Sequence, residues 1–150
     1  MASELLVYLE PLLKLILAAL LSGLIGLDRE KKGLPAGLRT YMLVCVASTL
    51  ATVASIDFFP NPDSLARIAA GLITGIGFLG AGSIMVSQNH VRGLTTAAGI
   101  WTMCILGMAV GMGMYPLSIG FSIIVYLILK LKFVEDKYKN KAKLSGFFRR

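Results

Sequence analysis

Residues 68–86 read IAAGLITGIGFLGAGSIMV and contain no charged side chain. About 20 consecutive apolar residues are enough for a helix to cross the hydrocarbon core of a bilayer, so this stretch predicts a transmembrane helix. Four further apolar stretches flank it, at residues 11–27, 41–59, 94–115 and 117–134. The sequence therefore predicts an all-α polytopic membrane protein with five transmembrane helices.

The composition of the chain supports this fold class. Hydrophobic residues make up 56% of the 150 residues and charged residues only 15%, and the mean hydropathy is +0.76. Soluble domains carry about 25% charged residues. Five spans leave no room for a separate globular domain, and the composition excludes disorder, a disulfide scaffold and a coiled coil. Cys45 and Cys104 lie inside apolar stretches, and we expect them to be small packing residues.

Basic residues concentrate on one side of the predicted bundle. All lysines and arginines except Lys14 and Arg67 fall in the loops at 28–40 and 87–93 or from residue 130 onward. The positive-inside rule therefore predicts an external N-terminus and a cytoplasmic C-terminus, and five spans also require termini on opposite sides. We expect a transmembrane domain at residues 1–134 and a basic cytoplasmic tail at 135–150.

When the sequence is aligned with itself at an offset of 56 residues, four pairs of identical residues coincide over residues 26–40 and 82–96. Gly26, Gly37, Leu38 and Thr40 fall on Gly82, Gly93, Leu94 and Thr96. This correspondence predicts a parallel repeat of helices 1–2 and 3–4 about an axis along the membrane normal. Four matches in a chain rich in glycine and leucine can also arise by chance.

Glycines mark the third span and the start of the fourth. Small residues let helices approach closely in lipid, so we expect helix packing at this set: Gly71, Gly75, Gly77, Gly80, Gly82 and Gly93. The alternative is a locally non-helical segment that lines a cavity, because many glycines weaken a helix.

Polar residues gather where the predicted spans meet the cytoplasm, and charged groups at membrane depth need a reason. The set comprises Asp28, Arg29, Glu30, Arg39, Thr40, Arg92, Thr95 and Thr96. We expect Asp28, Glu30, Arg39 and Arg92 to pair in one network and the two later threonines to donate hydroxyls across helices. The same network could hold a cation or a polar group of a partner. The alternative is a set of helix caps and interface anchors.

The outer side of the predicted bundle carries fewer charges. Asp63 or Ser64 is expected to cap the third span, and Asp63 to pair with Arg67. Asp57 and Asp63 are few ligands for a magnesium or calcium site, so the metal, if any, stays unknown. His90 is a lone loop histidine that we expect to be solvated.

No motif of a known enzyme class occurs in the chain, so we expect a protein without catalytic activity or cofactor. The basic tail beside the last span is expected to attract anionic lipid headgroups rather than nucleic acid.

Five helices form a small bundle, and the glycine-lined spans offer more packing faces than one chain can bury. We therefore expect a homo-oligomer, most simply a dimer.

Four strings of the sequence resemble one family in order and spacing. They are IGLDRE (residues 25–30), AGLRT (36–40), RIAAGLITGIGFLGAG (67–82) and VRGLTTAAGIW (91–101), and they resemble the MgtC/SapB (YhiD-like) family of bacterial membrane proteins. The resemblance implies an inner-membrane protein tied to magnesium limitation, acid adaptation and intracellular survival, with no established reaction. Some members regulate other membrane proteins, among them the F-type ATP synthase and a P-type magnesium transporter.

The sequence departs from the family pattern in two places. Asp28-Arg29 stands where the family usually has Glu-Arg, and the chain stops at Arg150 where virulence-type members continue into a soluble domain. We expect the membrane module alone.

Three functions remain open at this stage. The first is a non-enzymatic regulator that binds another membrane protein through a glycine-rich helix face. The second is a small homo-oligomeric transporter or channel for Mg²⁺ or another cation. The third is a lipid-interacting structural protein, which only the basic tail supports.

Overall fold

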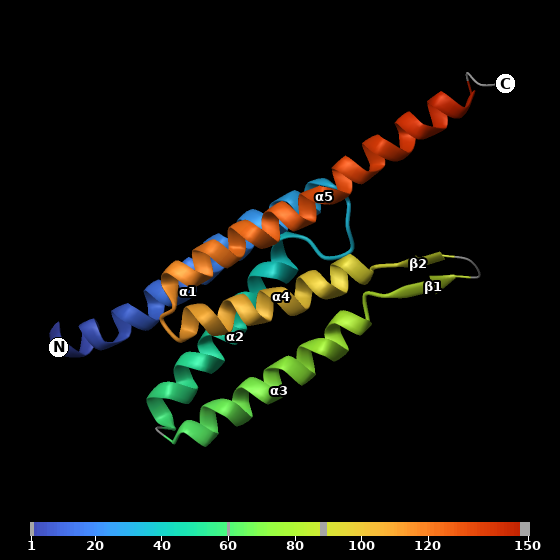
Figure 1. Cartoon of the computed structure of the whole chain (residues 1–150). Coiled ribbons are helices and arrows are strands. Elements are labelled where there is room, and N and C mark those ends of the chain that lie inside the picture. The colour runs from blue at the N-terminus through green and yellow to red at the C-terminus, as the bar shows by residue number, and fades with distance from the viewer. Residues whose placement is uncertain (1, 60, 88–89, 148–150) are drawn as a thin grey trace.

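The computed structural model describes the backbone of residues 2–59, 61–87 and 90–147, and the side chains of residues 9–59, 61, 63–87 and 90–131. Within these ranges the chain forms five helices and one β-hairpin (Figure 1). The elements are α1 (Ala2–Lys31), α2 (Leu38–Phe58), α3 (Pro62–Ala81), β1 (Met85–Ser87), β2 (His90–Arg92), α4 (Leu94–Gly111) and α5 (Tyr115–Phe147). The prediction of an all-α fold is confirmed, with the short hairpin as an addition.

Four of these helices are long and apolar enough to cross a bilayer. Their apolar segments are Leu9–Lys31, Leu38–Phe58, Asp63–Ala81 and Leu94–Gly111. The apolar part of α5, Tyr115–Leu131, is shorter than these four. Length and composition therefore support the first four predicted spans directly, and the fifth crossing stays a prediction.

The third helix has different ends from the predicted span. It begins at Pro62, and its cap is Asn61, whose side-chain oxygen accepts from the Asp63 backbone N–H (3.0 Å). The expectation that Asp63 or Ser64 caps this helix was therefore wrong. The helix ends at Ala81 rather than at Val86, because glycines weaken its last turn and the Ser83 hydroxyl bonds the Gly80 carbonyl (2.7 Å).

The residues that follow α3 form the β-hairpin, which extends away from the bundle (Figure 1). The strands are antiparallel and pair Met85 with Arg92 and Val86 with Val91. The chain then enters α4 through Gly93, whose φ of +89° favours glycine. A Cβ at this position would also overlap the Ser83 carbonyl, so the turn depends on glycine for two separate reasons.

Helix α2 and helix α4 form the centre of the bundle. Helix α1 packs on α2, α3 packs on α4, and α5 contacts α1 and α4. Figure 1 shows that successive helices alternate in direction, so that α1 and α3 end where α2 and α4 begin. We call this end, which carries Arg29, Arg39 and Arg92, the basic end.

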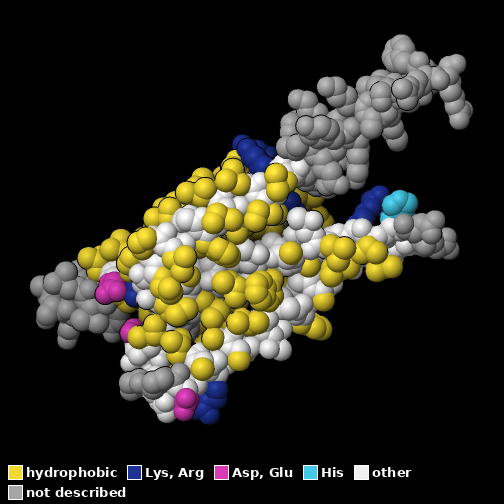
Figure 2. All heavy atoms as spheres, in the orientation of Figure 1, with side chains coloured by type: hydrophobic (Ala, Val, Ile, Leu, Met, Phe, Trp, Pro, Cys, Tyr) yellow, Lys and Arg dark blue, Asp and Glu magenta, His cyan; other side chains and the backbone are white. Residues whose placement is uncertain are grey.

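The interior combines apolar side chains with small polar ones. Tyr41, Met103 and Leu106 are fully buried, and both cysteines are buried and free, as expected for packing residues. The outer surface is apolar: Figure 2 shows hydrophobic side chains over much of the visible face, with charged side chains toward the ends of the molecule. Such a surface needs lipid around it, because soluble monomers rarely expose large contiguous apolar patches.

The fold agrees with the predicted repeat at one point only. Helices α2 and α4 begin directly after Gly37 and Gly93, the two glycines that the 56-residue shift pairs. Their backbones differ, however, with φ of −118° at the first glycine and +89° at the second. The duplication stays a prediction.

Candidate functional site

A buried arginine lies at the basic end of the bundle. Arg29, in the last turn of α1, is only 2% exposed. Its Nη2 donates to the Thr96 hydroxyl in the first turn of α4 at 3.4 Å. Its Nε has no hydrogen-bond partner among the described residues. Burying a guanidinium is costly unless it is paired, so Arg29 is the residue of this cluster that most needs an explanation.

The two carboxylates beside Arg29 in the sequence are engaged elsewhere. Asp28 pairs with Lys32, four residues on, with 2.6 Å between Oδ2 and Nζ. Glu30 accepts from the Leu38 backbone N–H at 2.8 Å and so caps the start of α2. The side chain of Glu30 also packs against Gly37, where a Cβ would come within 2.9 Å of it. Neither carboxylate forms an ion pair with Arg29 in the described part of the chain.

The other predicted members of the cluster occupy the surface. Arg39, Arg92 and Thr95 are exposed, and Thr40 is half-buried. Among the ion pairs of the described side chains, none joins Arg39 or Arg92 to a carboxylate. The structure therefore does not form the mutual network that we expected among Asp28, Glu30, Arg39 and Arg92. Thr96 does connect two helices, as the acceptor from Arg29.

Tyr41 belongs to the same site, although no sequence pattern had singled it out. Its side chain is fully buried on α2, close enough to Arg29 for that charge to act on the phenol. The phenol oxygen makes no hydrogen bond of good geometry within the described residues, and its polar neighbour there is the Arg29 guanidinium. The phenol oxygen lies where a Cβ on Gly99 would be, so the glycine makes room for it. A tyrosine one turn into an apolar span was the signal that could have revealed it.

A row of hydroxyl groups continues from this site along the contact between α2 and α4. The Thr49 hydroxyl lies 2.9 Å from the Gly107 carbonyl across the helices and 2.9 Å from the Cys45 carbonyl of its own helix, and its single proton is shared between these two acceptors. Ser48 donates to the Cys104 sulfur at 3.2 Å. These bonds hold α2 against α4 at a depth where polar groups have no water to bind.

The predicted packing glycines divide into two groups. Gly80 lies against Ala97 of α4, where an added Cβ would come within 3.3 Å of the Ala97 carbonyl oxygen, and Gly93 meets Ser83. Gly71, Gly75 and Gly77 have open space where a side chain would be, and a Cβ at Gly82 would meet only its own helix. Helix α3 is regular from Pro62 to Ala81, which contradicts the alternative of a non-helical third span.

The opposite end of the bundle carries the residues predicted on the outer side. Asp57, Asp63 and Arg67 are all exposed. The expected pair of Asp63 with Arg67 is not among the ion pairs of the described side chains. Within the same residues no group of three or more His, Cys, Asp or Glu side chains could hold a metal ion. On α1, Glu10 and Lys14 are four residues apart and form an ion pair at 2.9 Å.

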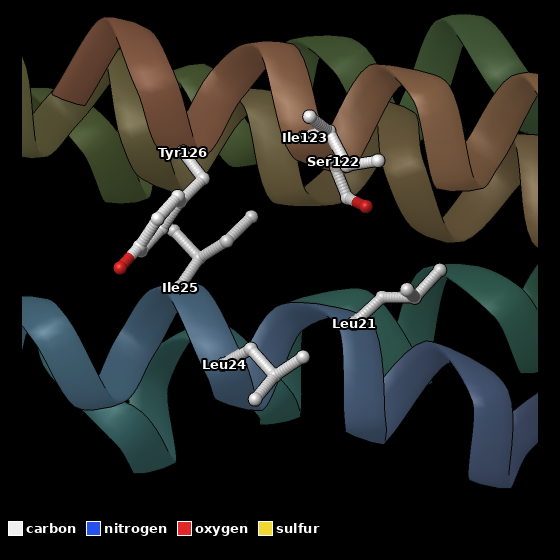
Figure 3. A pocket seen from close by; sticks show the side chains of 6 residues that line it. All are labelled: Leu21, Leu24, Ile25, Ser122, Ile123 and Tyr126. Atoms are coloured by element: carbon white, nitrogen blue, oxygen red, sulfur yellow. The ribbon is translucent and has the colours of Figure 1, made fainter. Parts of the chain in front are cut away.

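Two apolar hollows lie on the sides of the bundle. One, of about 540 Å³, is bounded by α2, α3 and α4 and includes Gly71 and Gly75 in its wall. The other, of about 240 Å³, lies between α1 and α5 (Figure 3), where Ile25 and Tyr126 point toward each other and Ser122 supplies a hydroxyl. Both are suited to lipid chains or to a further helix rather than to a hydrated ion.

The fold and the site define a small polytopic α-helical membrane protein with a buried arginine where its helices meet. The chain belongs to the MgtC family, whose sequence profile matches residues 15–137. This membership confirms the resemblance drawn from the four strings.

Three relatives are similar over most of this chain. It is 43% identical over 129 residues to the "Putative magnesium transporter YhiD" of Escherichia coli (strain K12), a match that covers 81% of this chain and 60% of that protein. It is 39% identical to Protein SapB of Bacillus subtilis (strain 168), covering 85% and 58%. It is 41% identical to Protein MgtC of Salmonella typhimurium (strain LT2), covering 76% and 48%. The chain thus spans about half to three fifths of these relatives, and no solved structure matches it.

Proposed function

We propose that this chain is a non-enzymatic protein of the bacterial inner membrane that serves magnesium homeostasis and stress adaptation by regulating another membrane protein. Its N-terminus would be external and its C-terminus cytoplasmic, as the distribution of basic residues indicates. The name of the relative YhiD, "Putative magnesium transporter", supports the link to magnesium.

The observation that carries the regulatory role is the open glycine face of α3. Gly71 and Gly75, four residues apart, have no atom within 4 Å of the position of a side chain. They lie in the wall of the apolar hollow, beside Ile68 and Leu72. Such spacing of small residues is typical of helix pairs that pack closely in lipid. The face therefore suits a transmembrane helix, from a second copy in a dimer or from the regulated protein.

The basic tail would add affinity for anionic lipid headgroups, at about 1 kcal/mol for each basic residue near the surface. The side chains of this tail lie outside the described residues, so this part of the proposal depends on sequence alone. We propose no cofactor and no nucleic-acid partner.

The test uses a bacterium that lacks its own members of the family and expresses this chain. The proposal predicts that the chain restores growth at low magnesium, co-purifies with a membrane protein and carries no Mg²⁺ flux in liposomes. The double variant Gly71→Leu, Gly75→Leu should lose growth rescue and co-purification at an unchanged protein level. Ala70→Leu is the matched control, because this exposed residue lies on α3 outside the hollow.

The alternative function is a small homo-oligomeric cation transporter. The observation in its favour is the row of hydroxyls between α2 and α4, together with the name of the YhiD relative. Saturable Mg²⁺ flux in liposomes from the purified chain, abolished by Asp28→Asn or Arg39→Ala, would establish this alternative and contradict the regulatory proposal.

A further inference from the structure

Among the described side chains, none forms an ion pair with Arg29. The guanidinium is almost fully buried, its Nε lacks a partner, and the neighbouring carboxylates Asp28 and Glu30 bind Lys32 and the Leu38 N–H instead. A buried arginine without a counter-ion is strongly destabilising. Among the described residues the site therefore has an excess of positive charge where a protein normally places an anion.

The start of helix α4 lies at the same place. Helix α4 begins at the basic end and has no acidic residue in its first turn, whereas the Glu30 carboxylate already caps the start of α2. The start of α4 has no side-chain cap, and Arg29 contacts Thr96 within that first turn. The N-terminal end of a helix carries about half an elementary positive charge and exposes unpaired N–H groups. Arg29 thus lies against the uncapped start of α4, where an anion would contact both the guanidinium and the first-turn N–H groups.

Two further features suit an anion that comes from outside the chain. The buried Tyr41 hydroxyl lies beside Arg29, and among the described residues it donates its own proton to no acceptor, so it can donate a hydrogen bond to an anion. Leu94 and Thr95, in the first turn of α4, are exposed, so this helix end lies at the surface of the bundle. Arg39 and Arg92 are exposed at the same end of the bundle and would attract negative charge toward it.

We propose that Arg29, Thr96, Tyr41 and the first-turn amides of α4 bind a phosphate-type oxyanion at the basic end. The guanidinium offers a planar set of donors that fits two phosphate oxygens, and a helix N-terminus favours the same charge. The site lies where the spans end, at the depth of the lipid headgroups. Two sources supply this chemistry: the headgroup of an anionic phospholipid and free inorganic phosphate.

The experiment measures the unfolding temperature of the purified full chain, in nanodiscs of neutral phosphatidylcholine, by intrinsic fluorescence. In the first arm inorganic phosphate replaces chloride at constant ionic strength. In the second arm phosphatidylglycerol replaces part of the neutral lipid. The proposal predicts a saturable rise of the unfolding temperature in at least one arm. A rise with phosphate identifies the free anion, and a rise with phosphatidylglycerol alone identifies the headgroup.

The variants assign the effect to the site. Arg29→Gln should weaken the apparent affinity about tenfold or more, because it removes a charge-assisted contact. The control is Arg39→Gln, which removes the same charge at an exposed position of the basic end and should weaken the apparent affinity far less. Thr96→Val and Tyr41→Phe keep the shape of the site and should each weaken binding several-fold. If Arg29→Gln does not fold, these two variants test whether the anion binds at this site. No rise in either arm, or equal responses in Thr96→Val, Tyr41→Phe and the unmodified chain, would overturn the proposal.

Discussion

Helices α3 and α4 both carry glycines four residues apart, and they use them in opposite ways. On α4, a Cβ at Gly107 would overlap the Cys45 carbonyl, and one at Gly111 would come within 2.7 Å of the Thr52 Cβ. On α3, a Cβ at Gly71 or Gly75 would meet nothing within 4 Å. The same motif thus forms an internal contact in one helix and a free surface in the other.

The difference shows what each helix does for the chain. The α4 glycines let α2 approach so closely that hydroxyl and carbonyl groups bond across the two helices, as Thr49 and Gly107 do. This contact holds the bundle together. Gly71 and Gly75 of α3 make no such contact within the described chain, so we attribute them to association with another helix.

The largest expected effect is that of Gly107→Ala. The added methyl group must displace the α2 backbone, and overpacking of this kind costs about 3 kcal/mol. We expect a large fall in the unfolding temperature in detergent, or loss of folded protein from the membrane. The matched change Gly75→Ala adds the same methyl group to the open face of α3 and should leave the unfolding temperature nearly unchanged. Equal effects of the two changes would remove the distinction between the helices.

A smaller effect is expected from Thr49→Val, which keeps the shape of the side chain and removes its hydroxyl. Loss of the bond to the Gly107 carbonyl should lower the free energy of unfolding by about 1 kcal/mol. Denaturation with sodium dodecyl sulfate measures this difference. The control is Thr102→Val, because the Thr102 hydroxyl donates only within its own helix, to the Ala98 carbonyl (2.6 Å). If both variants lost the same stability, the cross-helix bond would have no special role.

Much of the fold could be predicted from apolar runs and glycines. The predicted start of the fourth span, Leu94, is the first residue of α4. The predicted second span ends at residue 59, one residue after the end of α2 at Phe58. The end of α3 could not be predicted, because residues 82–86 are as apolar as the helix before them. What ends the helix is a local bond from Ser83 to Gly80 and the pairing of two short strands.

The composition of the site could be predicted, but its geometry could not. Asp28, Arg29 and Glu30 follow one another, and successive residues of a helix project about 100° apart. Only one of them can face the interior, and the contact with α4 decides that it is Arg29. The same holds for Thr95 and Thr96, of which only the second is buried. Sequence also could not separate Gly71 and Gly75 from Gly107 and Gly111, since that depends on which helices meet.

The most direct test of the open α3 face is oxidative cross-linking in intact membranes. Gly75→Cys places a thiol on this face, and Ala70→Cys places one on an exposed part of α3 outside the hollow. The native Cys45 and Cys104 are buried and should not react. We predict a cross-linked product, with a second copy or with another membrane protein, from Gly75→Cys and not from Ala70→Cys. No product from either variant, or equal yields from both, would contradict the account.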